Sequence, residues 1–237
     1  MPALVYMIPA VLQEEALATI PLMTTDAVRQ CQVFFTENER TARRYLKALW
    51  KHYLPGENIV IGDFEWFVIA PENEAAFRQR VKEGKTIGIL SEAGCPGVAD
   101  PGQSLAAIAQ DMQAVVKPLT GPSSILLALM ASGMSGQRFQ FHGYLPIDAG
   151  QRQKALKDLE AESARKDCTQ VFIETPYRNN QLLETILKHC QPATRLCIAV
   201  NLTGPGERVV TKTVANWKKE TPDFHKQPAI FLLYNSR

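Results

Sequence analysis

Short apolar runs alternate with amphipathic segments along most of this chain of 237 residues. Runs of this length are typical of buried strands, whereas the segments between them repeat apolar residues every three or four positions and predict helices. In the N-terminal half we expect strands over residues 4–8, 33–36, 58–62, 86–90 and 114–119, and helices over 39–53 and 72–83. This alternation predicts an α/β fold with a mostly parallel sheet.

The pattern continues through the C-terminal half and changes near its end. Helices are expected over 123–132, 151–166 and 179–190, and strands over 138–144, 169–174 and 195–201. Two further strands, 208–214 and 228–235, follow without a long helix between them, so the second sheet is expected to be mixed. We therefore expect two α/β domains, residues 1–118 and 119–237.

Composition narrows the function only a little. Hydrophobic residues make up 46% and charged residues 21% of the chain, as in ordinary globular proteins, and a net charge of +2 does not by itself indicate a nucleic-acid partner. No apolar run approaches the ~20 residues of a membrane span, and the first residues lack the pattern of a signal peptide. The cysteines are odd in number and the histidines isolated, so we expect a cytoplasmic protein with reduced thiols and no metal site.

The loop at residues 91–102, SEAGCPGVADPG, is the most informative stretch of the chain. It directly follows a predicted strand, and open α/β sheets place their ligands at the carboxyl ends of strands. Its glycines allow a ligand to approach the backbone, and its carboxylates supply hydrogen-bond acceptors. The candidate ligand-binding residues here are Ser91, Glu92, Ala93, Gly94, Cys95, Pro96 and Asp100. A plain strand-to-helix turn explains the same composition about equally well.

A second loop of small residues, PLTGPSS at 118–124, also lies between a predicted strand and a predicted helix. Ser123 or Ser124 is a natural N-cap, and the free N–H groups of the first helical turn, together with Gly121 and Pro122, are also able to hold a ligand. Because the two loops lie on either side of the expected domain boundary, we expect a ligand cleft between the domains. The sequence contains no phosphate loop, dinucleotide fingerprint or hydrolase nucleophile elbow.

Charged residues gather at two other places. Opposite the apolar face of the predicted helix 39–53 lie the cations Arg40, Arg43, Arg44, Lys47 and Lys51. A solvated helix face is the simpler interpretation, and contact with RNA phosphates is the alternative. Glu174 and Arg178 follow another predicted strand, either as a structural ion pair or as substrate-binding residues.

Several motifs, in order along nearly the whole chain, resemble those of the tetrapyrrole methylase superfamily. The loop 91–102 is similar to its SDAGTP…DPG signature, PLTGPSS is similar to its PLPGP segment, and Phe172, Glu174 and Arg178 fit its F-x-E-x-x-x-R pattern. Within the superfamily, the chain most resembles the bacterial branch that methylates the ribose 2′-hydroxyl of a cytidine in small-subunit ribosomal RNA. The resemblance implies a methyltransferase dependent on S-adenosylmethionine, with two α/β domains, the cofactor in the cleft between them, and a homodimeric assembly.

Three segments depart from the patterns of that branch. Residues 8–13 read IPAVLQ where it has P-T-P-I-G-N, residues 37–40 read ENER in place of E-D-T-R, and residues 200–203 read VNLT in place of R-E-L-T. The cofactor half of the site is therefore kept, whereas the substrate half differs. A second hypothesis is a methyltransferase that acts on a tetrapyrrole, another small molecule or a protein. Asn38 and Asn201, which replace acidic residues, favour a third hypothesis, a cofactor-sensing or RNA-binding module without catalysis.

Roles for individual residues follow from the resemblance and from the chemistry of methyl transfer. Pro9 and the two small-residue loops are expected to bind the cofactor. A ribose hydroxyl is a poor nucleophile at neutral pH, so a base is expected beside it, with Glu37 as the first candidate and Glu92 as the second. Arg40 is expected to hold the neighbouring phosphate by a bidentate contact. The expected substrate-binding residues are Arg43, Arg44, Glu174 and Arg178.

Overall fold

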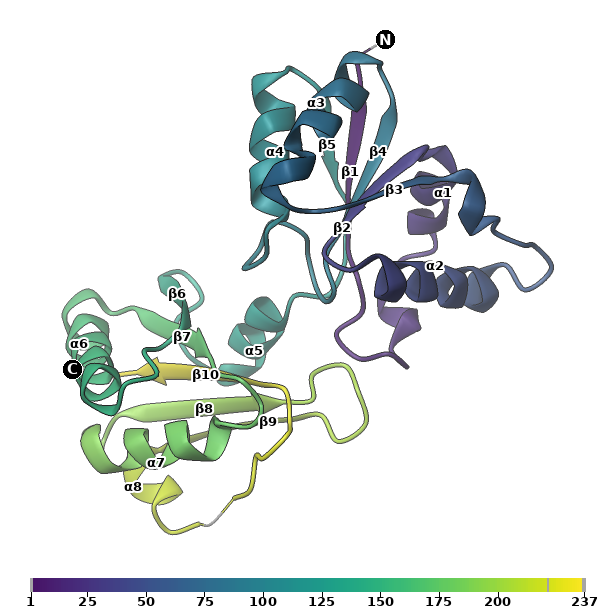
Figure 1. Ribbon diagram of the computed structural model, residues 1–237. Helices are drawn as coiled ribbons and strands as arrows, with labels where there is room; N and C mark the ends of the chain where they lie inside the picture. The colour runs from purple at the N-terminus through teal and green to yellow at the C-terminus, as the bar shows by residue number, and fades with distance from the viewer. Residues whose placement is uncertain (1, 221, 236–237) are drawn as a thin grey trace. The chain divides into compact units, whose positions relative to one another are not determined.

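A computed structural model describes residues 2–220 and 222–235 of the chain (Figure 1). The chain divides into two compact units, Met1–Ser123 and Ser124–Arg237. Each unit is built around its own five-stranded sheet and its own hydrophobic core. No helix within the described ranges is long and apolar enough to cross a membrane.

The sheet of the first unit has the strand order β3-β2-β4-β1-β5, and every neighbouring pair is parallel. Its strands are β1 (Leu4–Ile8), β2 (Val33–Thr36), β3 (Glu65–Val68), β4 (Thr86–Leu90) and β5 (Val115–Pro118). The three central strands read LVYMI, VFFT and TIGIL and are buried almost throughout, because helices cover both faces of the sheet. The prediction of a mostly parallel N-terminal sheet is confirmed.

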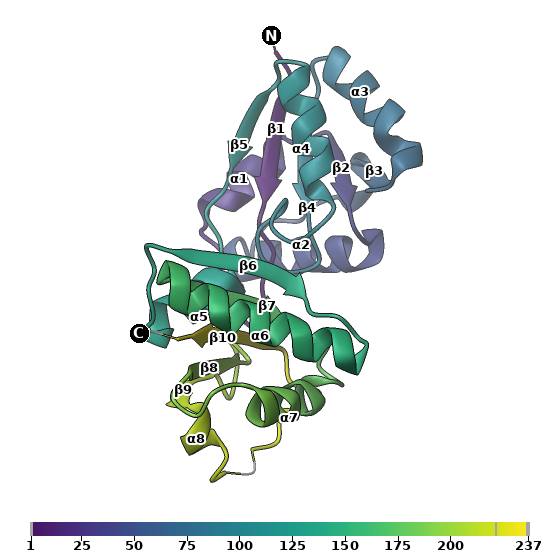
Figure 2. The same cartoon turned by 90° about the vertical axis from the view of Figure 1, so that its left-hand side faces the viewer.

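Two pairs of helices cover this sheet, one pair on each face (Figures 1 and 2). The helices are α1 (Met23–Gln30), α2 (Glu39–Tyr53), α3 (Glu74–Lys82) and α4 (Gly102–Asp111). Successive side chains of a strand point to opposite faces. Tyr6 and Ile8 therefore pack in the core beneath α1 and α2, whereas Val5 and Met7 pack beneath α3 and α4.

One predicted strand of the first unit is wrong. Residues 58–62 form no strand, and the edge strand β3 lies further along, at Glu65–Val68. The apolar run belongs to a short 3-10 helix, Ile61–Asp63, whose Ile61 fills the core beneath α2 while Val60 is exposed. Phe67 of the true strand stacks on Phe35 of β2, with 4.9 Å between ring centroids. A short apolar run does not distinguish a strand from a 3-10 helix, because either structure is able to bury Ile61.

The second unit has the strand order β6-β7-β10-β8-β9. Its strands are β6 (Phe139–Tyr144), β7 (Thr169–Ile173), β8 (Arg195–Val200), β9 (Arg208–Thr213) and β10 (Ala229–Tyr234). β6 and β7 are parallel, and the other three pairs are antiparallel. The prediction of a mixed C-terminal sheet is confirmed, and each predicted element of this half lies within two residues of the observed bounds.

The helices of the second unit also lie on both faces of its sheet (Figure 1). They are α5 (Ser124–Ser132), α6 (Ala149–Lys166), α7 (Asn179–His189) and the single turn α8 (Val214–Trp217). α6, α7 and α8 share one core with Phe172 of β7 and Phe231 of β10. α5 lies against β10, β9 and β8. Because neighbouring side chains of β10 alternate in direction, Ile230 and Leu232 face the side opposite to that core.

Candidate functional site

The carboxyl edge of the first sheet brings together loops that are far apart in the sequence. Because all its strands are parallel, the segments that follow β1, β2, β4 and β5 emerge at the same edge. Ala10, after β1, and Gly94, after β4, exchange two backbone hydrogen bonds, with N···O distances of 2.9 and 3.1 Å. Gly94 has a φ of +76°, a conformation that favours glycine.

The loop after β5 packs closely on the other two. A Cβ atom on Gly121 would overlap the ring of Pro9, so only glycine fits at this position. The Cys95 thiol donates weak hydrogen bonds to the carbonyl oxygens of Gly121 and Pro122, at 3.7 and 3.5 Å. Burial raises the pKa of Cys95, and the charge of Asp100 raises it further, so the thiol stays protonated and acts as a packing group. Of the residues predicted for the cofactor, Pro9, Gly94, Cys95, Gly121 and Pro122 therefore lie together.

Asp100 holds the long loop in shape. Its Oδ1 accepts hydrogen bonds from the backbone N–H groups of Gly97 and Gly102, both at 2.7 Å. Its second oxygen, Oδ2, is buried and receives no hydrogen bond within the described chain. The expectation that Asp100 contacts a cofactor directly stays a prediction, and its visible function is to position the glycines.

Glu37 also lies at this edge, directly after β2. Its Oε2 accepts a hydrogen bond of 2.6 Å from the backbone N–H of Glu92. Burial raises the pKa of Glu37; the hydrogen bond opposes this rise, and the nearby charges of Asp100 and Glu92 add to it. A carboxylate whose pKa is raised in this way is a stronger base than an ordinary glutamate. The two candidate bases of the sequence analysis are thus neighbours.

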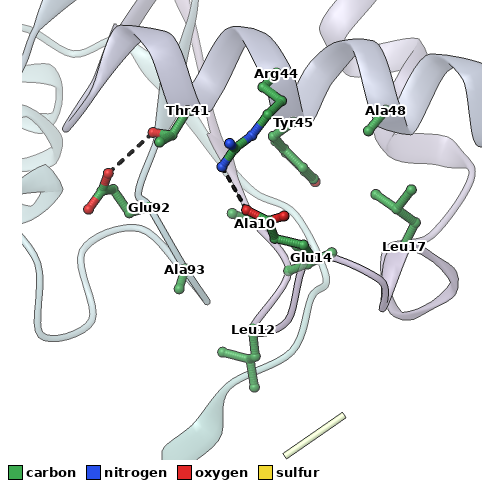
Figure 3. Close-up of a pocket in the computed structure, with 11 residues that line it drawn as sticks. Ala10, Leu12, Glu14, Leu17, Thr41, Arg44, Tyr45, Ala48, Glu92 and Ala93 are labelled. Atoms are coloured by element: carbon green, nitrogen blue, oxygen red, sulfur yellow. Dashed lines mark hydrogen bonds and ion pairs between the residues drawn. The ribbon is translucent and has the colours of Figure 1, made fainter. Parts of the chain in front are cut away.

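A pocket of about 440 Å³ opens beside Glu92, between α2 and the segment that follows β1 (Figure 3). Its apolar lining consists of Ala10, Val11, Leu12, Leu17, Ala48 and Ala93. Its polar lining consists of Glu14, Thr41, Arg44, Tyr45 and Glu92. The Thr41 hydroxyl lies within hydrogen-bond distance of the Asn38 carbonyl oxygen, at 3.0 Å, and of Glu92 Oε1, at 3.2 Å, so the Glu92 carboxylate lies at one end of the pocket beside α2.

Several residues of this pocket carried no sequence signal, and they lie beside Arg44, which was predicted to bind substrate. The Tyr45 hydroxyl donates to the carbonyl oxygen of Pro9 at 2.7 Å and so ties α2 to the loop after β1. In the sequence, only its hydroxyl distinguishes Tyr45 from an ordinary aromatic residue of an amphipathic helix. Arg44 forms an ion pair of 2.7 Å with Glu14 across the pocket (Figure 3). Nothing local to Glu14 or Leu17 in the sequence marks either of them as part of a site.

The cations of α2 divide into two groups. Arg43 forms an ion pair of 2.6 Å with Glu39 and lies over the ring of Trp66, so internal contacts hold it. Arg40, Lys47 and Lys51 are exposed, and no acidic partner is found for them among the described residues. These three cations form a solvent-facing stripe on the helix.

Asn38 departs from the aspartate of the E-D-T-R pattern, and it has a structural function of its own. It is the N-cap of α2, and its side-chain oxygen accepts hydrogen bonds from the backbone N–H groups of Arg40 and Thr41, at 3.0 and 3.3 Å. Asn and Asp are about equally good N-caps. Replacement of the acid at this position therefore preserves the start of the helix that carries Arg40 and Thr41.

Glu174 and Arg178, the substrate-binding residues predicted in the second unit, form an ion pair with each other. Glu174 is almost fully buried after β7, and its Oε1 accepts hydrogen bonds from the guanidinium of Arg178, at 2.6 and 3.0 Å, and from the N–H of Thr175, at 2.7 Å. Asn201 and Thr203 follow β8 with φ values of +51° and +69°. Ser124 is the first residue of α5, and Ser123 precedes it. Within the described residues, no group of histidine, cysteine or acidic side chains has the arrangement of a metal site.

Comparison with known proteins decides the family. The model of a family described as tetrapyrrole (corrin/porphyrin) methylases matches residues 16–217. The chain belongs to this family. Among solved structures, a diphthine synthase covers 98% of this chain and 89% of its own, with a TM-score of 0.67 and 14% identity. Uroporphyrin-III-C-methyltransferase from Thermus thermophilus covers 98% and 94%, with a TM-score of 0.57 and 18% identity. These similarities show that the tetrapyrrole methylase fold extends through both units.

Curated relatives of this tetrapyrrole methylase include ribosomal RNA small subunit methyltransferase I of Helicobacter pylori strain J99. It is 33% identical over 180 residues, which are 72% of this chain and 61% of that protein. The protein of the same name from Haemophilus influenzae is 30% identical over 158 residues, or 65% of this chain and 54% of its own length. The chain thus spans less than two thirds of these relatives. Family members are methyltransferases that use S-adenosylmethionine.

Proposed function

We propose that this chain is a methyltransferase that transfers the methyl group of S-adenosylmethionine to a ribose 2′-hydroxyl of small-subunit ribosomal RNA. The observation that carries the proposal is the carboxyl edge of the first sheet, where three small-residue loops meet beside a glutamate of raised pKa. Family membership and the ribosomal RNA methyltransferases among the relatives support it.

Backbone conformation and charge support the assignment of these loops to the cofactor. Gly94 and Gly121 let the three loops approach one another closely, and Ser91 and Pro96 belong to the loop that we assign to the cofactor. The carboxylates of Glu37, Glu92 and Asp100 lie close enough to influence one another electrostatically. Their negative charge complements the positive sulfonium of S-adenosylmethionine. We also assign Ser123 and Ser124 to the cofactor, as the resemblance implies.

Glu37 is the base of the proposed reaction. A sulfonium methyl group is reactive by itself, so the protein mainly has to align the acceptor oxygen with the methyl carbon, which supplies roughly 7–11 kcal/mol of the barrier. Removal of the hydroxyl proton is the remaining task, and the raised pKa of Glu37 suits it. Arg40, two residues beyond the helix N-cap, is exposed and is assigned to a phosphate of the acceptor strand.

The remaining assignments complete the proposal. Arg44 contributes to substrate binding from the pocket, and Arg43 supports the same surface through its stacked position over Trp66. We also assign Glu174 and Arg178 to substrate binding, as their match to the F-x-E-x-x-x-R pattern implies. We also propose a homodimer located in the cytoplasm, as the resemblance to the ribosomal RNA branch implies; sedimentation of the purified protein tests the assembly.

Calorimetric titration with S-adenosylmethionine tests the cofactor site. Gly121→Ala places a Cβ against the Pro9 ring and forces the loops apart, so we expect at least about a tenfold loss of affinity, because a displaced cradle misaligns several hydrogen bonds at once. Gly62→Ala is the matched control, because a Cβ there meets no atom within 4 Å. Equal affinity of both variants and the wild type would remove the cofactor from these loops. Absence of binding to the wild type at millimolar cofactor would support the non-catalytic hypothesis instead.

A further inference from the structure

The pocket beside Glu92 borders the cofactor loops and shares part of its wall with them. Of residues 91–96 and 121–124, only Glu92 and Ala93 line it. The rest of its wall comes from α2 and from the segment after β1 (Figure 3). A ligand in this pocket would therefore touch the cofactor region at one end and project away from it along α2.

The lining favours a flat, uncharged ring. Aliphatic side chains form most of the wall, and the Tyr45 ring is fixed in place by its hydrogen bond to Pro9. Rigid aromatic and aliphatic walls of this kind suit the face of a planar heterocycle. The charged lining is acidic on balance, with Glu14 and Glu92 against Arg44. That balance disfavours a phosphate group or a polycarboxylate tetrapyrrole inside the pocket.

Glu92 supplies a directional acceptor at the end nearest the proposed cofactor. Its Oε1 is engaged by the Thr41 hydroxyl, whereas its Oε2 accepts no hydrogen bond from the described residues, and the side chain is exposed. A free carboxylate oxygen pairs well with an exocyclic amino group and poorly with a carbonyl oxygen at the same place. The pocket therefore selects a base that carries an amino group.

We infer that this pocket holds one unstacked nucleoside of the acceptor RNA, with its base between Tyr45 and the aliphatic wall and its amino group at Glu92. The inference rests on the proposed function and names the part of the site that receives the acceptor. Enzymes that do chemistry on a base commonly take it out of the stack into a fitted pocket, at the cost of lost stacking, and we extend this to a nucleotide whose ribose is methylated. The aliphatic wall and the carboxylate offset that cost.

The phosphates of the acceptor RNA are assigned to a different side of α2. Arg40, Lys47 and Lys51 face solvent on the side of the helix next to the pocket face formed by Thr41, Tyr45 and Ala48. From the first to the last of these cations the helix rises by about 16 Å, at 1.5 Å per residue. The strand thus binds along the helix while a single nucleoside turns inward.

Arg44 lies where the pocket and the cation stripe meet. Its partner Glu14 is highly exposed, with 81% of its side chain accessible against 67% for Arg44. Exposed ion pairs contribute little to stability. An RNA phosphate at the mouth of the pocket therefore replaces Glu14 as the partner of Arg44 at low cost, and the negative charge of Glu92 disfavours entry of that phosphate.

A bulky side chain in the pocket tests the inference in the full-length protein. Ala48→Trp fills the pocket from α2, and Ala75→Trp places the same side chain on an exposed position of α3 as the matched control. Small ribosomal subunits and their extracted RNA serve as acceptors with labelled S-adenosylmethionine. For Ala48→Trp we expect kcat/KM for RNA to fall by about 10²-fold, because the acceptor oxygen is displaced, and the cofactor affinity to stay within twofold of the wild type. Ala75→Trp should match the wild type in both measurements.

The other outcomes separate this inference from the proposed function. A wild-type protein that methylates neither acceptor overturns both. Wild-type transfer together with undiminished transfer by Ala48→Trp overturns the pocket assignment alone. Loss of cofactor binding in Ala48→Trp would assign the pocket to the cofactor, and this result would also overturn the assignment of the pocket to a nucleoside. Circular dichroism checks the fold, and if Ala48→Trp is unfolded, Leu17→Trp, which fills the pocket from another wall, is judged by the same criteria.

Competition with short homopolymers tests the role of Glu92. Oligocytidylate should inhibit transfer at a concentration at least about tenfold lower than oligouridylate, because uracil presents a carbonyl oxygen to the carboxylate. This preference should disappear in Ala48→Trp. Equal inhibition of the wild type by the two oligomers would contradict the assignment of the amino group to Glu92.

Discussion

Glu37 shows how a parallel sheet tunes the chemistry of a single carboxyl group. Burial after β2 raises its pKa, and the charges of Asp100 and Glu92 act in the same direction. A carboxyl group with a raised pKa in the folded state stabilises the fold only while it is protonated. That contribution is present below the ordinary pKa of glutamate, ~4.3, and is lost as the pH rises through the raised value.

Activity should depend on pH in the opposite sense. The base must be ionised, so kcat/KM should rise with pH along a limb whose apparent pKa lies above the ordinary glutamate range. Glu37→Gln should remove this limb and lower the rate of methyl transfer by about 10²-fold or more, while cofactor binding stays intact. Rates measured between pH 4.5 and 8 for Glu37→Gln and for the exposed control Glu72→Gln check this. An unchanged rate in Glu37→Gln would leave Glu92 as the base.

At the scale of elements, α2 combines three functions in fifteen residues. One side of the helix is buried through Ala42, Leu46 and Leu49, a second lines the pocket, and a third carries the exposed cations. Asn38 fixes the first turn, so the register of all three sides is set at one point. A change in the cap would therefore shift the pocket and the cation stripe together.

The cation stripe of α2 predicts how RNA binding responds to salt. Each phosphate contact on a single strand contributes about 0.7 to the slope of log affinity against log salt concentration. Lys47→Gln/Lys51→Gln should therefore weaken RNA binding and lower the slope by about 1.4. Arg78→Gln/Lys82→Gln on α3 removes the same charge from another exposed helix face and should leave the slope unchanged. A salt-independent affinity in the wild type would favour a small-molecule acceptor.

At the scale of the whole molecule, each of the two units has hydrophobic clusters of its own. Both hydrophobic clusters of the first unit draw their members from residues before the unit boundary, and the cluster of the second unit draws its members from residues after it. A unit of this length is within the usual range of an independently folding domain.

A fragment of residues 1–123 should accordingly fold alone. We expect helical and sheet signals in its circular dichroism spectrum and one cooperative transition in urea, because its apolar residues already have their packing partners. A broad, non-cooperative transition would show that the first unit depends on the second for its stability.

The local pattern of apolar residues was enough to predict most of this architecture, because buried side chains recur at a fixed spacing in strands and at another fixed spacing in helices. The sequence predicted the bounds of β1, β2 and α2 and the meeting of the loops after β4 and β5, since parallel strands share a carboxyl edge. The pocket was not predictable in the same way. Its Glu14–Arg44 and Tyr45–Pro9 contacts join residues about thirty or more positions apart, and no period links them. The structural role of Asn38 was likewise hidden, because a helix cap and a lost acidic group look the same in sequence.

The contact between Gly121 and Pro9 has an evolutionary consequence. Any side chain at position 121 would occupy the space of the Pro9 ring, and a smaller residue at position 9 would leave a gap that a side chain at 121 could fill. Neither position can drift alone without opening the place where the two loops touch. Within lineages of this family the two positions should therefore change together or not at all, and a paired substitution would mark a lineage in which the loops have been refitted to each other.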